Sequence, residues 1–460
     1  MGLLNNIYDN VPIFVQNIMV SIKGYLNSKT RYGKVYYEYL DFLEQYDEWT
    51  LEQKKEYRNS ELKAFLKYVI DNSSFYRELY KGIDLDKINC PEDLTRLPVV
   101  DKETLRKNID SVVTAKTGTV EGHTGGTTGK SLIVQFTKED MMKRMAQLDH
   151  FKRKVGFVNN KMKRATFNAK HIVPPAQKKK VFWRYNKPCK QMIFSSFHIT
   201  DANLPYYVKK LNKFKPLAID GFFTSMCDVA NYIERKNIKL TFQPIAIFPT
   251  SETLTDVGRS LLERVFGCKV YDQYASSEGA PFVTECAEQK LHVQLASGII
   301  EKFEDGSDEV LVTSFTTHGT PLIRYKIGDS MKFAQANSQC TCGDNQPIVE
   351  YIQGRALDFL YTAEGAKINA GSVANLFKNM PNSVIRAQLV QDKMDEVTAF
   401  LETDSERYSE KYDEKLLEEF ERKFGKNTKL NIVHVEGIDR EKSGKFRMIK
   451  NNVDNALKGK

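Results

Sequence analysis

Residues 245–279, IAIFPTSETLTDVGRSLLERVFGCKVYDQYASSEG, contain the pattern that decides the fold. The apolar run Ile245–Phe248 predicts a buried strand, and Thr255–Phe266 predicts a helix that ends at Gly267, as helices commonly do. The run Lys269–Tyr274 predicts the next strand. Two strands that are joined by a helical crossover pair in parallel, so this stretch predicts a parallel sheet with helices packed on its faces.

Apolar patterns on either side of this stretch predict further elements. Much of the first hundred residues is helical in pattern, with apolar side chains at positions 62, 65, 66, 69 and 70. The apolar runs Gly298–Phe303 and Glu309–Phe315 are separated by the turn residues 304–307. This spacing predicts an antiparallel hairpin and therefore a second sheet.

The pattern changes again after Gly354. We expect strands at 386–390, 396–401 and 430–435 and a helix at 410–424. The apolar side of that helix is predicted to consist of Leu416, Leu417, Phe420 and Phe424. The chain has 460 residues, more than one core usually contains. We therefore predict an α/β protein with a large N-terminal domain of mixed sheets layered with helices, residues 1–354, and a small mobile α+β C-terminal domain, residues 355–460.

Composition and hydropathy are those of a globular protein. Hydrophobic residues make up 41% of the chain, and no apolar run reaches the 18 residues that suggest a membrane span. The N-terminus shows no secretory signal pattern, so we expect a cytoplasmic enzyme. The stretch Val11–Ile22 has two interpretations, which are an amphipathic helix in peripheral contact with a membrane and a helix packed on its own domain.

Positive charge is concentrated in residues 151–200. The whole chain has a formal charge of +9, whereas this segment has thirteen Lys or Arg residues and no Asp or Glu. Such a segment is either a solvated basic face or a binding surface for a large anion.

A glycine-rich segment at 124–131 is predicted to bind phosphate. It reads Thr124-Gly125-Gly126-Thr127-Thr128-Gly129-Lys130-Ser131. Backbone N–H groups can approach phosphate oxygens where glycine lacks the Cβ atom, and hydroxyls and a lysine add donors. ATP is the expected ligand. The segment is not a Walker A loop, because Thr124 stands where that motif needs glycine, and the alternative is a surface hairpin.

Three later segments carry polar groups suited to a nucleotide. At the end of the predicted strand 269–274, Tyr274 can stack on a purine, and beyond it a serine hydroxyl can meet a phosphate and Glu278 can bind Mg²⁺. We expect these groups at the carboxyl end of a parallel strand, where open α/β sheets bind ligands. Asp329 follows a glycine turn and suits ribose hydroxyls, and Lys445 lies on a glycine-containing loop.

In this order and spacing, the segments resemble the adenylate-forming superfamily, which includes acyl-CoA synthetases and peptide-synthetase adenylation domains. The similar motifs are TGGTTGK at 124–130, YASSEG at 274–279, RYKIGD at 324–329, GRALDFL at 354–360 and SGKFR at 443–447. The text FGCKVYDQYASSEGAP and the C-x-C-G before the GR motif are most similar to one branch. That branch contains phenylacetate–CoA ligases and CapK-type capsular polysaccharide biosynthesis proteins.

The resemblance implies roles for individual residues. Tyr274 would stack on adenine, Ser277 would contact a phosphate, Glu278 would bind Mg²⁺ and Asp329 would hold the ribose. Arg355 would be a second nucleotide contact, Asp358 the hinge and Lys445 the catalytic lysine of adenylation.

Some positions depart from the family pattern. Ser251 replaces the glycine that usually precedes Glu252, and both residues are expected beside the nucleotide. Ala275 and Ser277 replace the common Gly and Thr, and Leu357 replaces the first acid of the hinge motif.

The resemblance further implies ATP- and Mg²⁺-dependent activation of a carboxylate as an acyl-adenylate, followed by transfer to a second nucleophile. We expect a role in surface polysaccharide biosynthesis, with an anionic acceptor that is a glycan, a nucleotide-linked sugar or CoA, and not a nucleic acid. The alternatives are an aryl- or acyl-CoA ligase and, from another class, a non-catalytic nucleotide-binding scaffold. The presence of both Glu278 and Lys445 argues against a scaffold.

The seven cysteines are odd in number and scattered, which is typical of reduced thiols. Three of them, Cys286, Cys340 and Cys342, share with His292 the ligand types that suit tetrahedral Zn²⁺. We predict either a structural zinc site that joins the two pairs or reduced cysteines without a metal.

Overall fold

The structure is a computed structural model in which most of the chain is described. The described residues are 3–115, 117–123, 132–168, 172–174, 177, 179–304, 307–335, 338–353, 359–363, 367–369, 373, 375–377, 384–404, 408–439 and 446–453.

The chain folds into two compact units, and each unit is built from separate segments. The first unit consists of residues 1–21, 162–270 and 353–460, and the second consists of residues 22–161 and 271–352. Among the helices in the described ranges, none combines the length and the apolar character needed to cross a membrane.

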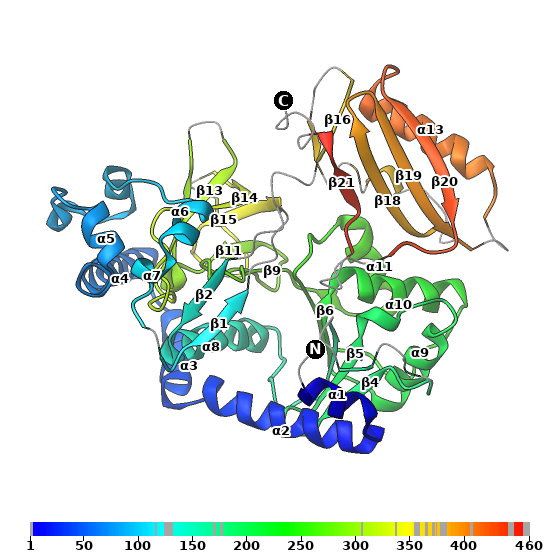
Figure 1. The fold of residues 1–460 in the computed structure, drawn as a ribbon, viewed down its shortest axis with the longest axis horizontal. Helices are drawn as coiled ribbons and strands as arrows, with labels where there is room; N and C mark the ends of the chain where they lie inside the picture. Colours follow the sequence, from blue (N-terminus) through cyan, green and yellow to red (C-terminus); the bar gives the residue numbers. More distant parts are fainter. Residues whose placement is uncertain are drawn as a thin grey trace. The chain divides into compact units, whose positions relative to one another are not determined.

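A six-stranded sheet forms the centre of the first unit (Figure 1). Its strands are β3 (Arg164–Asn168), β4 (Trp183–Asn186), β5 (Gln191–Ser195), β6 (Ala218–Phe222), β7 (Ala246–Thr250) and β8 (Lys269–Val270), in the order β4-β5-β3-β6-β7-β8. All neighbours pair in parallel except β4 and β5. The predicted α/β class and the parallel sheet are therefore confirmed.

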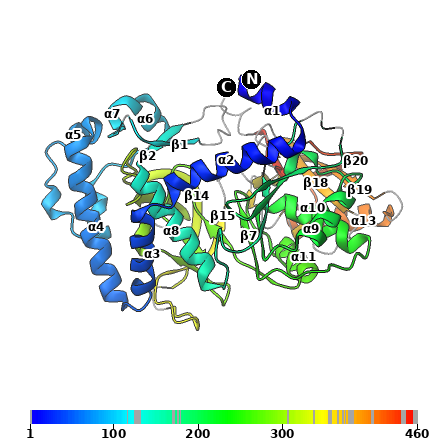
Figure 2. The same cartoon turned by 90° about the horizontal axis from the view of Figure 1, so that it is seen from below.

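Helices cover this sheet as the crossover pattern requires. They are α9 (Leu204–Phe214), α10 (Phe223–Arg235) and α11 (Asp256–Phe266), and η3 (Ser196–His198) is a short 3₁₀ turn. Figure 2 shows α9, α10 and α11 beside β7. The helix α11 starts where the Thr255 hydroxyl accepts the N–H of Gly258 and ends at Gly267, whose φ is +69°. Both ends match the sequence prediction within one residue.

The predicted strand Lys269–Tyr274 is wrong beyond Val270. The chain leaves the parallel sheet there, and β9 (Gln273–Tyr274) belongs to another, antiparallel sheet. After Val270, side-chain carboxylates take the backbone N–H groups that a continuing strand would use. The Asp272 N–H donates to the Glu285 carboxylate, and the Gln273 N–H donates to the Asp272 carboxylate. YASSEG therefore follows an antiparallel strand and not the end of a parallel one.

A four-stranded sheet forms the C-terminal part of the first unit. Its strands are β18 (Val384–Lys393), β19 (Glu396–Thr403), β20 (Lys429–Val435) and β21 (Ile449–Asn451), and α13 (Lys411–Phe424) packs on it. The short elements β16 (Phe359–Tyr361), β17 (Lys367–Asn369) and η5 (Asn375–Phe377) precede it. Leu416, Phe420 and Phe424 are buried as predicted, but Leu417 is 43% exposed, because it lies one residue off the apolar side of the helix.

A seven-stranded sheet forms the core of the second unit, in the order β12-β13-β14-β15-β11-β10-β9. Beyond β9, its strands are β10 (Val283–Glu285), β11 (Leu291–Val293), β12 (Gly298–Lys302), β13 (Glu309–Ser314), β14 (Tyr325–Phe333) and β15 (Ile348–Gln353), with η4 (Leu295–Ser297) between two of them. The predicted hairpin is confirmed, since β12 pairs antiparallel with β13.

Helices and one small hairpin complete the second unit. The helices are α3 (Lys34–Tyr46), α4 (Leu51–Asn72), α5 (Ser74–Leu79), α6 (Lys102–Lys107), α7 (Ile109–Val112) and α8 (Lys138–Lys154), with 3₁₀ turns η1 (Leu85–Lys87) and η2 (Pro91–Arg96). The strands β1 (Val120–His123) and β2 (Ile133–Phe136) pair antiparallel. Of the apolar positions predicted in α4, 62, 65, 66 and 69 are buried, whereas Ile70 is half-buried and packs against the same core.

The N-terminal helices are α1 (Leu3–Asn10) and α2 (Ile13–Arg31). The stretch predicted to be amphipathic lies largely in α2, where Gln16 is buried and Val20 packs on the core of the first unit. Phe14 and Ile18 are more than half exposed. The helix thus packs on the protein through one side and exposes apolar side chains on another.

Candidate nucleotide-binding site

The loop that follows β9 is fixed by its own serine and by a buried arginine. The Ser276 hydroxyl accepts the N–H groups of Gly279 and Ala280 at 3.1 and 3.0 Å. Gly279 has φ +104°, and a Cβ atom there would lie 2.5 Å from Thr317 Cγ2. Only glycine fits this position, so the loop has one well-defined course.

Arg144 on α8 binds the same loop through hydrogen bonds to its backbone carbonyls. One guanidinium nitrogen, Nη1, donates to the carbonyls of Gly279 and Ala280 at 2.9 and 3.1 Å and to the Thr316 hydroxyl at 3.0 Å. Burial lowers the pKa of Arg144 to about 10, which keeps the group charged at neutral pH. Arg144 was not predicted from the sequence, because nothing in the surrounding helical sequence distinguishes it from a surface arginine.

Glu278 is the acid of this loop and is only 6% exposed. Among the residues that the structure describes, none donates a hydrogen bond to its carboxylate. A buried carboxylate that has no cation beside it among the described residues suits a hard divalent ion, so the residue fits the predicted Mg²⁺ ligand.

Tyr274 and Asp329 are brought together by strands of the same sheet. The Tyr274 hydroxyl donates to Asp329 Oδ2 at 2.7 Å, with Tyr274 on β9 and Asp329 on β14. Two residues that are 55 positions apart in the sequence are thus in direct contact. The bond fixes the orientation of the tyrosine ring beside a carboxylate.

The strands that flank the glycine-rich segment lie against the loop after β9. A Cβ atom at Gly122 of β1 would lie 2.8 Å from the Ser277 carbonyl oxygen and 2.9 Å from Val134 of β2. Residues 124–130 themselves lie outside the described residues. The contact of Gly122 with Ser277 lies two positions before that segment in the sequence.

We predict that Gly122→Ala disturbs this contact. The new methyl group would push β1 away from the Ser277 backbone, which should cost about 1–3 kcal/mol of unfolding free energy and slow ATP–pyrophosphate exchange. Thermal unfolding and the exchange rate would measure both effects. Gly437→Ala is the matched control, because no heavy atom lies within 4 Å of a Cβ atom there. Equal behaviour of the two variants would contradict a close approach at Gly122.

Ser251 and Glu252 lie in the first unit, between β7 and α11. The backbone of Ser251 is left-handed, with φ +67°, a conformation that favours glycine. The Glu252 carboxylate accepts the backbone N–H of Thr224 at 2.8 Å and its hydroxyl at 2.9 Å, at the start of α10. It also accepts the N–H of Phe446 at 3.3 Å. Glu252 therefore anchors the residue that follows Lys445.

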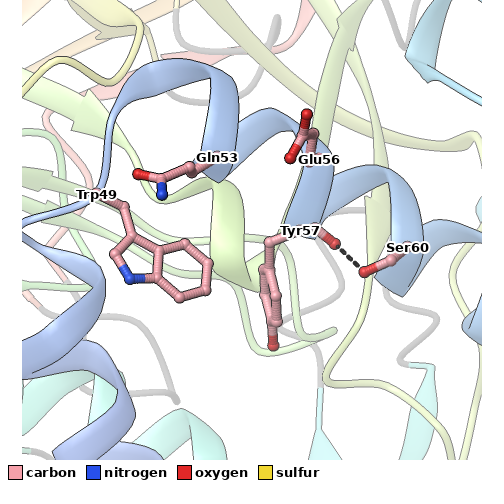
Figure 3. A pocket seen from close by; sticks show the side chains of 5 residues that line it. All are labelled: Trp49, Gln53, Glu56, Tyr57 and Ser60. Atoms are coloured by element: carbon pink, nitrogen blue, oxygen red, sulfur yellow. Dashed lines mark hydrogen bonds between the residues drawn. The ribbon is translucent and has the colours of Figure 1, made fainter.

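Three further predicted residues, Arg355, Asp358 and Lys445, lie outside the described residues. A cavity of about 380 Å³ in the second unit is lined by Trp49, Gln53, Glu56, Tyr57 and Ser60 (Figure 3). These lining residues include none of the predicted nucleotide contacts, so the cavity belongs to a different part of the unit.

A second cavity, of about 670 Å³, lies in the first unit and is lined by ion pairs. Arg386 of β18 contacts Asp228 of α10 at 2.7 Å and Glu402 of β19 at 3.0 Å. Arg235 of α10 pairs with Asp201 and, at 3.0 Å, with Asp404. These pairs join α10 to the C-terminal sheet.

The predicted zinc ligands are brought together in the second unit. The Sγ atoms of Cys286, Cys340 and Cys342 and a ring nitrogen of His292 all lie within 4.8 Å of one another.

A family model described as the CapK C-terminal domain matches residues 360–452. Protein CapK of Staphylococcus aureus is 39% identical over 455 residues, which cover 98% of this chain and 100% of that protein.

Two solved structures of 2-hydroxyisobutyryl-CoA ligase share the fold. The structure in the postadenylation state in complex with R3-HIB-AMP has a TM-score of 0.71 at 16% identity, covering 89% of this chain and 92% of that chain. The structure with 2-HIB-AMP and CoA in the thioesterification state has a TM-score of 0.53 at 18% identity, with the same coverage of both chains.

Proposed function

Because this chain belongs to the CapK family of the adenylate-forming superfamily, we propose that it activates a carboxylate with ATP. The products of this step are an acyl-adenylate and pyrophosphate. The hydrogen bond between Tyr274 and Asp329 is the observation that carries the proposal. It supports the proposal because it brings into direct contact the two residues to which the resemblance assigns adenine and ribose.

The chemistry follows from the fact that a carboxylate has no good leaving group. One carboxylate oxygen attacks the α-phosphorus of ATP, the bond to the bridging oxygen breaks, and pyrophosphate leaves with its electron pair. Negative charge grows on the phosphoryl oxygens, and Lys445 stabilises it. Glu278 would hold Mg²⁺, which when bound neutralises phosphate charge. Segment 124–130, Ser277 and Arg355 complete the contacts to the phosphates and the nucleotide.

We also propose that residues 355–460 act as a lid that turns at Asp358. The C-terminal part has an apolar core of its own, formed by β18, β19, β20 and α13 together with Leu360 and Ile449. Such a core lets a domain move as one body. A closing lid protects a mixed anhydride from water. Two ion pairs, Arg386 with Asp228 of α10 and Arg235 of α10 with Asp404, support one arrangement of this lid.

The second nucleophile belongs to an anionic acceptor in our proposal, a glycan or nucleotide-linked sugar of surface polysaccharide synthesis. In the basic segment 151–200, some cations are paired or buried and others are exposed to an acceptor. Lys154 pairs with Asp47 at 3.0 Å, Arg164 pairs with Asp220 at 3.0 Å, and Arg184 is fully buried. Lys179, Lys180 and Lys187 are exposed and carry the charge that an acceptor can meet.

CoA is the second candidate acceptor. The solved 2-hydroxyisobutyryl-CoA ligase, which shares the fold, has been captured with CoA. A thiol would then attack the acyl carbon of the adenylate and displace AMP. Product analysis with CoA and with nucleotide-linked sugars, given the same adenylate, separates the two acceptors.

Reversing the charge of Lys178, Lys179 and Lys180 to Glu tests the acceptor surface. Attraction of a large anion acts over the Debye length of about 8–10 Å, whereas adenylation depends on short contacts to ATP. We expect pyrophosphate exchange to stay within about twofold and transfer to the acceptor to fall, with high salt reproducing the fall in the unmodified enzyme. Loss of both reactions would instead assign the segment to the fold or the ATP site.

The decisive test of the proposed function is ATP–pyrophosphate exchange against a panel of carboxylic and amino acids. Exchange that depends on one class of carboxylate supports adenylation and identifies the substrate class. Nucleotide binding without exchange for any member of a broad panel would favour the non-catalytic scaffold.

A further inference from the structure

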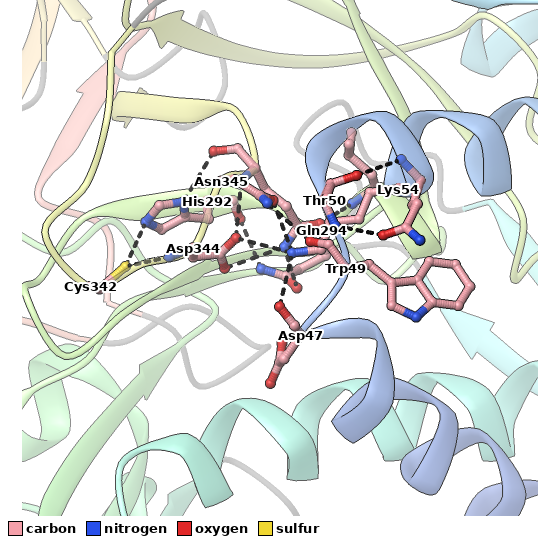
Figure 4. A network of polar contacts seen from close by, with 12 residues as sticks. Asp47, Trp49, Thr50, Lys54, His292, Gln294, Cys342, Asp344 and Asn345 are labelled. Carbon is pink, nitrogen blue, oxygen red and sulfur yellow. Dashed lines mark hydrogen bonds and ion pairs between the residues drawn. The ribbon is translucent and has the colours of Figure 1, made fainter.

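Three thiols and one imidazole lie close together beside the seven-stranded sheet of the second unit. Cys286 directly follows β10 and His292 lies on β11, while Cys340 and Cys342 lie in the connection between β14 and β15. The two pairs are about fifty residues apart in the sequence. Figure 4 shows His292 and Cys342 facing each other across this junction.

Two of the distances between ligand atoms match the edges of one tetrahedron, and all the ligand atoms lie within 4.8 Å of one another. Cys286 Sγ and Cys340 Sγ are 3.7 Å apart, and Cys342 Sγ is 3.6 Å from His292 Nε2. Bonds of about 2.3 Å to sulfur and about 2.0–2.1 Å to nitrogen give tetrahedron edges of about 3.5–3.8 Å. A disulfide needs an S–S distance of about 2.05 Å, so the sulfurs are placed as co-ligands and not as a bonded pair.

Neighbouring backbone groups contact His292 and Cys342 in a way that suits them as metal ligands. His292 Nδ1 lies 3.2 Å from the Gln346 carbonyl oxygen, which can only accept, so the ring proton is on Nδ1. Nε2 therefore presents its lone pair toward Cys342, as metal-bound histidines do. The Asp344 N–H points at Cys342 Sγ at 3.4 Å and would stabilise a thiolate.

Two tight turns present the sulfurs. The Gly343 N–H donates to the Cys340 carbonyl at 3.2 Å, and Gly343 has φ +85°. The Gln289 N–H donates to the Cys286 carbonyl at 2.9 Å. Each turn follows a ligand directly and fixes its direction.

A polar network behind the cluster holds the ligand loop in place (Figure 4). Lys54 of α4 is 1% exposed and donates to Asn345 Oδ1 at 2.9 Å. Asn345 in turn donates to the Trp49 carbonyl at 3.0 Å. The loop is thus bound to α4 and to the connection before it, which restricts the ligands even without a metal.

We propose that Cys286, His292, Cys340 and Cys342 bind one structural Zn²⁺ ion. Four protein ligands complete a tetrahedron, so no position is open for a substrate or for water. The ion would link the β10–β11 hairpin to the loop before β15. Since Val283 of β10 pairs with Tyr274 of β9, the metal stabilises the edge of the sheet that carries Tyr274.

Metal analysis of the purified full-length chain tests the site. We expect about one equivalent of zinc, released by a strong chelator together with a fall in unfolding temperature, because the binding free energy of a closed site is folding free energy. Adding Co²⁺ to the chelated protein should give thiolate-to-cobalt charge-transfer bands and the intense visible bands of a tetrahedral site. Iron in place of zinc, or octahedral cobalt spectra, would overturn the assignment.

Cys340→Ser should lose zinc and the cobalt bands, and Cys189→Ser is the matched control because Cys189 is also half-buried and lies outside the cluster. Where Cys340→Ser fails to fold, Asn345→Ala provides the second variant, since it frees the ligand loop from Lys54 and from the Trp49 carbonyl and should lower zinc affinity. Full zinc content in Cys340→Ser, or unchanged zinc affinity in a folded Asn345→Ala, would overturn the proposal. These readouts need no substrate, so they are independent of the proposed ligase activity.

Discussion

Lys445→Ala is expected to lower the rate of acyl-adenylate formation by about 10²- to 10³-fold, while ATP affinity changes by less than about tenfold. A lysine that meets charge as it develops on the phosphoryl group contributes to the transition state much more than to the bound ground state. Pyrophosphate exchange measures the first quantity, and equilibrium titration with ATP measures the second.

The contact of Glu252 with Phe446 provides a comparison variant for this experiment. Because Glu252 accepts the N–H of the residue after Lys445, Glu252→Gln should reduce exchange by much less than loss of the lysine itself. Lys450→Ala is the control for charge, since Lys450 lies on β21 of the same unit and is half-exposed. Equal losses of ATP binding and of turnover in Lys445→Ala would contradict the assigned role.

Glu278→Gln is expected to raise the Mg²⁺ concentration needed for half-maximal pyrophosphate exchange by about tenfold or more, because a neutral amide oxygen is a weaker ligand for a hard cation. The substitution keeps the size of the side chain, and no described residue depends on the carboxylate for a hydrogen bond. The unfolding temperature should therefore change little.

Glu52→Gln is the control for this prediction, as Glu52 is exposed on α4. Titration of exchange with Mg²⁺ at saturating ATP separates the two variants. An unchanged Mg²⁺ requirement in Glu278→Gln would place the ion on other residues.

Most of the elements that local patterns predicted are present in the structure, because caps and apolar spacing act within a few residues. The helix α11 illustrates this, with a threonine at its start and a glycine at its end. The strand predicted at 269–274 failed because Asp272 and Glu285 take its backbone bonds, and Glu285 lies thirteen residues further on. A single-strand pattern does not contain that information.

In the candidate site, too, some features follow from residue chemistry and others depend on the fold. Residue chemistry led to the prediction of Tyr274, Asp329 and the four soft ligands, and the structure brings Tyr274 into contact with Asp329 and the four soft ligands close to one another. Their contacts depend on strand pairing across the whole unit. Arg144 was missed because its role is to donate hydrogen bonds to the carbonyls of Gly279 and Ala280. These carbonyls are 135 and 136 residues away in the sequence.

The interleaving of the two units determines the order in which they can form during synthesis. The six-stranded sheet of the first unit is contained in residues 164–270 and is complete once that stretch has left the ribosome. The helices α3 to α8 are made earlier, yet the seven-stranded sheet that covers Leu62 and Phe65 is made later, from residues 273–353. The apolar side of α4 therefore stays without the strands that cover it until those later residues are made, and exposed apolar surface of this kind makes an incomplete chain prone to aggregation.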